Sequence, residues 1–145
     1  MDFGAGFGET RVITREPPSL GAPYPVLVPQ VNADGNDVGG IAMPEVAVPL
    51  GTYTGWNVTV PPLPGLRYLA GLVGAFVPFT GTREARLAAG DARPSIAERY
   101  RSRQEYLMMV SRATQMLIDQ RFMLASDADA VRGRAAEVWD AVAGR

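Results

Sequence analysis

The stretch from Ser102 to Val142, SRQEYLMMVSRATQMLIDQRFMLASDADAVRGRAAEVWDAV, decides the fold class of this chain. Two apolar stripes run through it at the roughly 3.6-residue spacing of amphipathic helices. They consist of Leu107, Val110, Ala113, Thr114, Leu117 and Ile118, and then of Ala128, Val131, Ala135, Val138, Trp139 and Val142. A short break near Leu124 separates the stripes. Helices joined by so short a link pack antiparallel, so the sequence predicts a helical pair over residues 95–143.

Helix-capping patterns extend the helical region toward the N-terminus. Pro94-Ser95-Ile96-Ala97-Glu98 holds a capping box, in which the serine hydroxyl bonds a free backbone N–H and the glutamate reaches back. A second box runs from Ser102 to Glu105. Thr82 is placed to begin a further short helix, which Gly90 would end.

The N-terminal part of the chain has the opposite character. Eleven of the 12 prolines lie at or before Pro78, and 13 of the 16 glycines lie at or before Gly81. Such a composition favours strands and turns over helices. We therefore expect one unit, residues 1–145, with an extended or β subregion over 1–80 and a helical subregion over 81–145. The expected fold class is α+β, an extended, Pro/Gly-rich β-hairpin half followed by an antiparallel helical pair.

Several segments of the first half are expected to be extended. They are Arg11 to Arg15, Tyr24 to Val31, Val38 to Met43, Glu45 to Leu50 and Thr52 to Val60. The turn-forming run from Asn32 to Asp37 joins the second and third as a hairpin. Between Leu66 and Phe79, periodicity does not decide between a strand and a short buried helix.

The composition excludes several classes of function. A formal net charge of -1 argues against binding to nucleic acid, which requires a basic excess. Histidine, cysteine and lysine are absent from the sequence. Thiol nucleophiles, thiolate metal sites, lysine Schiff bases and histidine-activated serines are thereby ruled out within this chain. The sequence also has no Gly-x-Ser-x-Gly nucleophile elbow, so it offers no catalytic residue.

No metal or cofactor is expected either. Asn32-x-Asp34-x-Asn36 has the alternating oxygen ligands of a calcium loop, but Asp37 replaces the required glycine and Met43 the bidentate glutamate. The start of the chain lacks the basic and apolar regions of a signal peptide. The longest apolar stretch, Tyr68 to Phe79, falls short of the roughly 20 residues of a membrane span. We therefore expect no membrane span, and the compartment stays open.

Three residues stand out as candidates for a binding site: Tyr53, Trp56 and Asn57. Tyrosine and tryptophan combine a large apolar body with one polar tip, which suits a core corner and a ligand wall equally well. Gly51 and Gly55 bracket them, so the backbone can turn sharply or approach a neighbour closely. Core packing and the lining of a substrate pocket both remain open for these three residues.

A set of phrases between Thr14 and Trp139 carries a family resemblance. They are Arg15-Glu16-Pro17-Pro18, Tyr24-Pro25-Val26-Leu27-Val28-Pro29, Asp34-Gly35-Asn36, Gly39-Gly40-Ile41, Pro44-Glu45-Val46-Ala47-Val48-Pro49-Leu50, Thr52-Tyr53-Thr54-Gly55-Trp56-Asn57, Phe76-Val77-Pro78-Phe79, Gly90-Asp91-Ala92-Arg93-Pro94-Ser95 and the helical end from Glu98-Arg99-Tyr100 onward. As a set they resemble the carboxyl-terminal part of a bacterial family, the alpha/beta hydrolase domain proteins. Members of that family are several times longer, with their α/β core largely upstream of this stretch.

The resemblance implies ester-type hydrolysis for a parent protein and places no catalytic residue in this chain. One hypothesis is a C-terminal segment of such a hydrolase, which covers the core or shapes the substrate entrance. The other is a stand-alone binding or protein-interaction module without chemistry. The expected partner is an upstream hydrolase core or a second copy of the chain, held through the apolar stretch Leu66 to Phe79.

Overall fold

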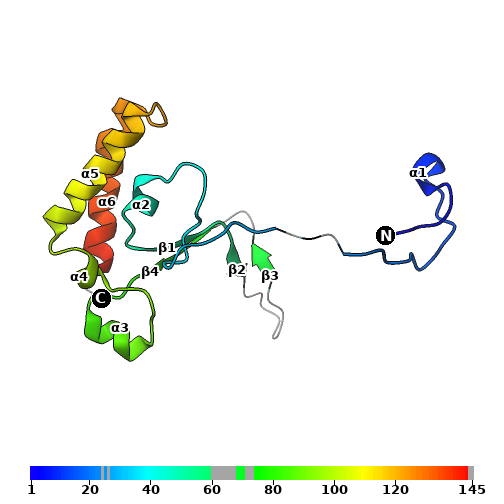
Figure 1. The fold of residues 1–145 in the computed structure, drawn as a ribbon, viewed down its shortest axis with the longest axis horizontal. Helices are drawn as coiled ribbons and strands as arrows, with labels where there is room; N and C mark the ends of the chain where they lie inside the picture. The colour runs from blue at the N-terminus through cyan, green and yellow to red at the C-terminus, as the bar shows by residue number, and fades with distance from the viewer. Residues whose placement is uncertain (24, 26, 60–67, 71–73, 144–145) are drawn as a thin grey trace.

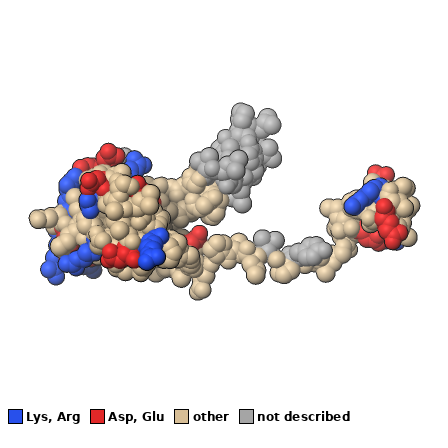
Figure 2. Space-filling model, turned by 90° about the horizontal axis from the view of Figure 1, so that it is seen from above, with Lys and Arg blue, Asp and Glu red and all other residues tan. Residues whose placement is uncertain are grey.

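The computed structural model describes residues 1–23, 25, 27–59, 68–70 and 74–143. Figure 1 shows a main body that holds the strands and most of the helices, and a small N-terminal lobe that lies apart from it. The arm between them, residues 20–31, carries no charged side chain, and Figure 2 shows the charges gathered over the body and the lobe. Within the described residues, no helix has the length and apolar character needed to cross a membrane.

The helical pair is present as the sequence predicts. Helices α5 (Arg103–Asp119) and α6 (Ala128–Val142) run antiparallel and side by side (Figure 1), and a 3-10 turn, η1 (Ala125–Asp127), comes directly before α6. The fully buried face of α5 consists of Tyr106, Val110, Thr114 and Leu117. It begins one residue earlier than the predicted stripe, because the Tyr106 ring is buried in the core, whereas Leu107 is only partly buried.

The predicted caps also form. Helix α3 (Arg83–Ala89) begins after Thr82, whose hydroxyl accepts from the Ala85 N–H, and ends at Gly90 in the left-handed conformation. Helix α4 (Ile96–Arg99) carries the capping box of Ser95 and Glu98. Helix α5 begins after the second predicted cap, Ser102, whose Oγ accepts a hydrogen bond from the Glu105 N–H.

Strands β1 (Gly51–Thr54) and β4 (Ala75–Pro78) form one antiparallel pair, and β2 (Asn57–Thr59) and β3 (Tyr68–Ala70) form another. Tyr53 pairs with Phe76 in the first, and Asn57 with Ala70 in the second. The prediction of an extended segment from Thr52 to Val60 is confirmed for 52–54 and 57–59, which a bend at 55–56 divides into two strands, and Val60 lies outside the described residues. The described parts of 66–79 form strands rather than a helix, so the α+β class is confirmed.

Two of the extended segments are predicted wrongly. Residues 11–15 form no strand, because helix α1 (Phe7–Thr10) ends at Arg11 in the left-handed conformation and the next residues fold back onto the lobe, where Thr14 N and Arg15 N both donate to Phe3 O. The segment expected to be extended from Glu45 begins as helix α2 (Pro44–Ala47) instead. Proline is favoured at the first position of a helix, where its missing N–H costs nothing.

The predicted hairpin around residues 32–37 is much shorter than expected. The turn itself forms, but the only β-pairing beside it among the described residues is the bridge between Val31 and Asp37. Pro25 and Pro29 remove backbone donors from the first arm, which explains why no ladder extends along it. Tyr24 and Val26 of that arm lie outside the described residues.

The core joins both halves of the chain. The buried apolar residues are Val48, Leu50, Phe79, Ile96, Tyr100, Tyr106, Val110 and Val142. The Tyr106 ring stacks on Trp139 at 5.0 Å between centroids, and Tyr100 meets the same indole edge-on at 6.0 Å. Leu50 and Phe79, which flank the strand pair β1–β4, thus share one core with this aromatic cluster.

Candidate functional site

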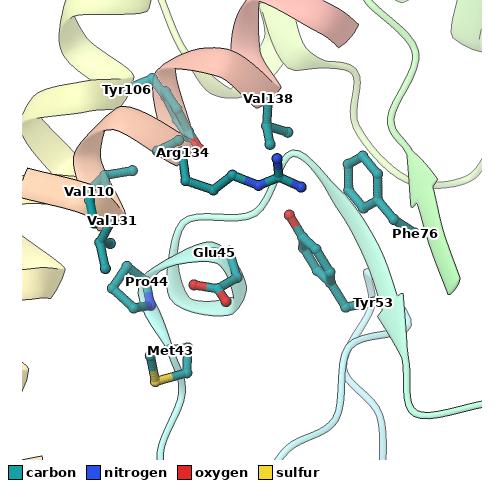
Figure 3. Close-up of a pocket in the computed structure, with 12 residues that line it drawn as sticks. Met43, Pro44, Glu45, Tyr53, Phe76, Tyr106, Val110, Val131, Arg134 and Val138 are labelled. Carbon is teal, nitrogen blue, oxygen red and sulfur yellow. The ribbon is translucent and has the colours of Figure 1, made fainter. Parts of the chain in front are cut away.

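A cavity of about 390 Å³ lies between strand pair β1–β4, helix α2 and the helical pair. Its walls are mainly apolar, with Tyr106 and Val110 from α5 and Val131 and Val138 from α6 (Figure 3). A volume of this size is at the small end of the range for ligand pockets, roughly 300–1,000 Å³. The cavity brings polar side chains together over an apolar floor.

Tyr53 and Phe76 form the strand wall of the cavity. They are register partners across β1 and β4, and their rings lie 4.8 Å apart at an interplanar angle of 31°. Gly51 makes room for this wall, because a Cβ there would lie 2.5 Å from a Phe76 ring carbon. Burial raises the pKa of the Tyr53 phenol to about 12, with a smaller contribution from the nearby Glu45 carboxylate. The phenol is therefore neutral and able to donate a hydrogen bond at physiological pH.

Arg134 and Glu45 supply the charges at the cavity. Arg134 projects from α6, and in Figure 3 its guanidinium lies close to the hydroxyl end of Tyr53. Glu45 projects from the first turn of α2 and also lines the cavity. An arginine is cationic at every relevant pH and offers only donors, whereas an ionised glutamate offers only acceptors. The lining thus offers donors from Tyr53 and Arg134 and acceptors from Glu45.

The three candidate residues from the sequence, Tyr53, Trp56 and Asn57, do not share one site in the structure. Tyr53 lines the cavity. Trp56 does not: it sits in the bend after β1 and is 51% exposed. Asn57 begins β2, beyond that bend and away from the cavity lining. Core packing is therefore not the role of Trp56 in this chain.

Sequence reasoning missed Arg134, Glu45 and Phe76. A signal for Arg134 does exist, because it stands three residues after Val131 and four before Val138, on the border of the apolar stripe of α6. Glu45 follows the proline that opens α2, a helix that was expected to be a strand. Phe76 could be placed only once its register with Tyr53 was known.

Two arginine–carboxylate pairs stabilise the region around strands β1 and β4. Arg93 Nη1 donates to Thr52 Oγ1 at 2.7 Å and to the carbonyl of Val77 at 3.1 Å, so one guanidinium ties β1 to β4. Asp91 holds that guanidinium, and the hydrogen bond from Arg93 lowers the Asp91 pKa to about 2.

The second pair fixes the 32–37 turn to the same region. Arg99 donates to the Asp34 carboxylate at 2.9 Å, and its guanidinium lies 4.1 Å from the centre of the Phe79 ring. Both pairs are more than four-fifths shielded from solvent, so water competes little with them. Asp34-Gly35-Asn36 and Gly90-Asp91-Ala92-Arg93-Pro94-Ser95, which carry part of the family resemblance, therefore meet behind the cavity as a structural brace.

The described residues offer no assembled catalytic machinery. Ser95 Oγ does donate to a Glu98 carboxylate oxygen at 2.8 Å, but the serine is fully buried. A hydrogen bond from Arg86 lowers the pKa of Glu98 to about 2, which makes it a very weak base. The Ser111 hydroxyl donates a hydrogen bond to the Leu107 carbonyl within α5. No group of three or more acidic side chains in the described ranges could hold a metal ion.

A second hollow, of about 370 Å³, lies on the other side of α2. Ile41, Met116, Leu117 and Phe122 are among the residues that line it. It is more open to solvent than the first and offers no charged side chain. Helix α2 thus packs on α5 between the two hollows. Of these two hollows, the cavity lined by Tyr53 has charged side chains in its lining, and the second has none.

Comparison with known proteins gives one match. A profile described as the alpha/beta hydrolase domain matches residues 9–133. Neither the curated proteins nor the solved structures include a match to this chain. The matched residues comprise most of the 145-residue sequence, including β1–β4, α2–α5 and the first turns of α6. The chain therefore belongs to the alpha/beta hydrolase domain family.

Proposed function

We propose that this chain is a C-terminal segment of a bacterial hydrolase of the alpha/beta hydrolase domain family, and that it shapes the substrate entrance without taking part in the chemistry. In such enzymes the nucleophile stands on an elbow at the top of an α/β sheet. The described strands form two-stranded antiparallel pairs, and the sequence contains neither histidine nor cysteine. The nucleophile and base would then come from outside this sequence.

The observation that carries the proposal is the cavity at Tyr53. It combines apolar walls from four elements with a neutral phenol, a guanidinium and a carboxylate at its mouth. That combination is typical of a site that binds and orients a small ligand. Tyr53 is the substrate-lining residue in this proposal. Trp56 and Asn57 lie outside the cavity and would line a substrate only if the hydrolase core extended the site past the bend at residues 55–56.

The exposed side of the strand pair supports the expected contact with a hydrolase core. Phe76 and Val77 are 36% and 47% exposed. They belong to the stretch 66–79, whose residues 66–67 and 71–73 lie outside the described part of the chain. Because side chains alternate along a strand, Val77 lies on the face of β4 away from the cavity that Phe76 lines, and an exposed apolar side chain there favours an interface. In the proposal, an upstream core or a second copy of the chain covers Val77.

The second candidate is a stand-alone binding module, which would use the same cavity without a hydrolase. The DNA upstream of the coding sequence distinguishes the two. A Gly-x-Ser-x-Gly elbow in the same frame or in an adjacent gene supports the hydrolase segment. Unrelated sequence on that side supports the stand-alone module.

Binding at the cavity is tested with ethyl 4-phenylbutyrate, a stable neutral ester of suitable size. Saturation-transfer NMR should show contact between this ester and the protein. Ala135→Trp should abolish that contact, because Ala135 lines the cavity and an indole would fill it. Ala141→Trp is the matched control, since Ala141 lies on the exposed side of the same helix. Equal signals from both variants would contradict the proposal.

A further inference from the structure

We propose that the Tyr53 cavity selects ligands with an apolar body and a single carboxylate, such as aryl-alkyl monocarboxylates. This inference rests on the proposed function and names the ligand class of the same site. It follows from three features: the apolar walls, the two donors of Tyr53 and Arg134, and the single acidic side chain in the lining, Glu45.

The apolar walls of the cavity favour a ligand with an apolar body. The cavity floor is formed by the side chains of Val110, Val131, Ala135 and Val138, with the Tyr53–Phe76 pair on one side. None of these except Tyr53 has a polar group on its side chain. An apolar chain or ring gains free energy from leaving water here, at about 25 cal/mol for each Å² buried. A strongly hydroxylated ligand would leave its polar groups unpaired against the same walls.

The hydrogen-bond donors of Tyr53 and Arg134 favour a ligand with a negatively charged head group. In Figure 3 the Tyr53 hydroxyl and the Arg134 guanidinium converge at one side of the cavity. Burial keeps the Tyr53 phenol protonated, with its pKa raised to about 12, and the guanidinium is always charged. A ligand oxygen with a negative charge satisfies both donors, and hydrogen bonds to charged groups are stronger than those between neutral ones.

Arg134 is available for such a ligand. The ion pair that the structure gives it is with Glu137, at 3.7 Å, and the two side chains are 77% and 73% exposed. An exposed pair of this length on one helix contributes little stability. Turning the guanidinium toward a ligand carboxylate would therefore cost little.

Glu45 limits the ligand to one negative charge. Its carboxylate comes from α2 and lines the same cavity as Arg134 of α6, and it offers only acceptors when ionised. Glu45 is exposed, so solvent weakens its charge, but a second carboxylate on a ligand beside it is still repelled. The site thus favours a monocarboxylate over a dicarboxylate of the same length.

The test compares 4-phenylbutyrate with 4-phenylbutan-1-ol, which share the apolar body and differ in charge. Titrations followed by NMR at pH 7 give the dissociation constant of each. We expect the acid to bind about tenfold more tightly than the alcohol. Arg134→Gln should reduce that ratio to about one without weakening the alcohol. Glu45→Gln should tighten the acid and leave the alcohol unchanged.

Arg132→Gln is the matched control. Arg132 lies on the same helix and forms the same kind of i,i+3 pair, with Asp129, but it is not part of the cavity lining. Its loss should leave the ratio at about tenfold. Equal binding of acid and alcohol to the parent, or an equal loss in both arginine variants, would overturn the charge preference and leave the proposed function standing. Binding of neither compound would overturn both.

Discussion

The side-chain Oδ1 of Asn36 accepts a hydrogen bond from the backbone N–H of Tyr53 at 2.7 Å. The Asn36 Nδ2 donates to the carbonyl of Gly51 at 3.1 Å, so one amide serves two backbone groups of β1. Both groups face away from β4, since the bond from Phe79 N to Leu50 O fixes which residues of β1 pair with β4. Asn36 therefore closes the open edge of the strand that carries Tyr53 into the cavity.

Removing that amide should destabilise the fold. Asn36 is 1% exposed, so Asn36→Ala leaves two shielded backbone groups without partners, and we expect a loss of about 2–4 kcal/mol. Asn32→Ala is the control, because the Asn32 side chain also bonds two backbone groups, the N–H groups of Asp34 and Asn36, but lies exposed, where water replaces it. Urea unfolding measures both variants, and equal losses would show that Asn36 has no special role at β1.

The two tryptophans should respond very differently to truncation. Trp139 stacks on Tyr106 and packs against the core, so Trp139→Ala should cost about 3 kcal/mol. Trp56 is 51% exposed, and Trp56→Ala should change stability by no more than about 0.5 kcal/mol. The denaturant midpoints of the two variants measure this difference. A Trp139 variant as stable as the parent would mean that the aromatic cluster does not hold the strands to the helices.

Stability should fall as the pH rises from about 10 to about 12. Burial raises the pKa of Tyr53 and of Tyr100 to about 12, and that of Tyr106 further still, from an ordinary value of 10.0. Above pH 10 the unfolded chain releases phenolic protons that the folded chain retains, so rising pH favours unfolding.

The composition makes this alkaline transition unusually easy to assign. The sequence has no lysine, cysteine or histidine, so tyrosines are the side chains that titrate between pH 9 and 12. Urea midpoints at pH 9, 10 and 11 should decline, and Tyr53→Phe should decline less steeply. Midpoints that stay constant to pH 11.5 would show that these phenols are not shielded from water.

The isolated chain should associate through the exposed side of β4. Val77 is 47% exposed on the face of β4 away from the cavity that Phe76 lines, and the proposal places a partner over it. Light scattering at high concentration should detect dimers or larger species, and Val77→Asp should reduce them. Val38→Asp, at a residue that is 56% exposed elsewhere in the chain, should not. A monomer at all concentrations, without binding of a hydrophobic dye, would favour the stand-alone module.

The helical half was predictable because its determinants are local. Thr82, Ser95 and Ser102 each bond an N–H three residues away, and the stripe of α5 repeats within a few turns. A sequence displays such short-range relationships directly. The prediction of α2 as a strand is wrong for a related reason, since Pro44 acts as a helix start in a four-residue segment that is too short to show periodicity.

The site was predictable only in part because it is assembled from distant segments. Tyr53 was identified from its chemistry, but its partners Phe76 and Arg134 lie 23 and 81 positions further along the chain. The bond from Asn36 to Tyr53 spans 17 positions and depends on a turn that the sequence shows, against a strand edge that it does not. Strand register and the packing of α6 decide these contacts, and neither is a local property.

Incubation of the isolated chain with 4-nitrophenyl butyrate tests the central claim most directly. The account places ligand binding at Tyr53 and the chemistry outside this sequence, which contains no histidine, cysteine or nucleophile elbow. It predicts release of nitrophenol at the rate of the buffer blank and of a boiled control. Saturable, heat-labile turnover that disappears on one Ser→Ala change, at Ser19, Ser95, Ser102, Ser111 or Ser126, would contradict it.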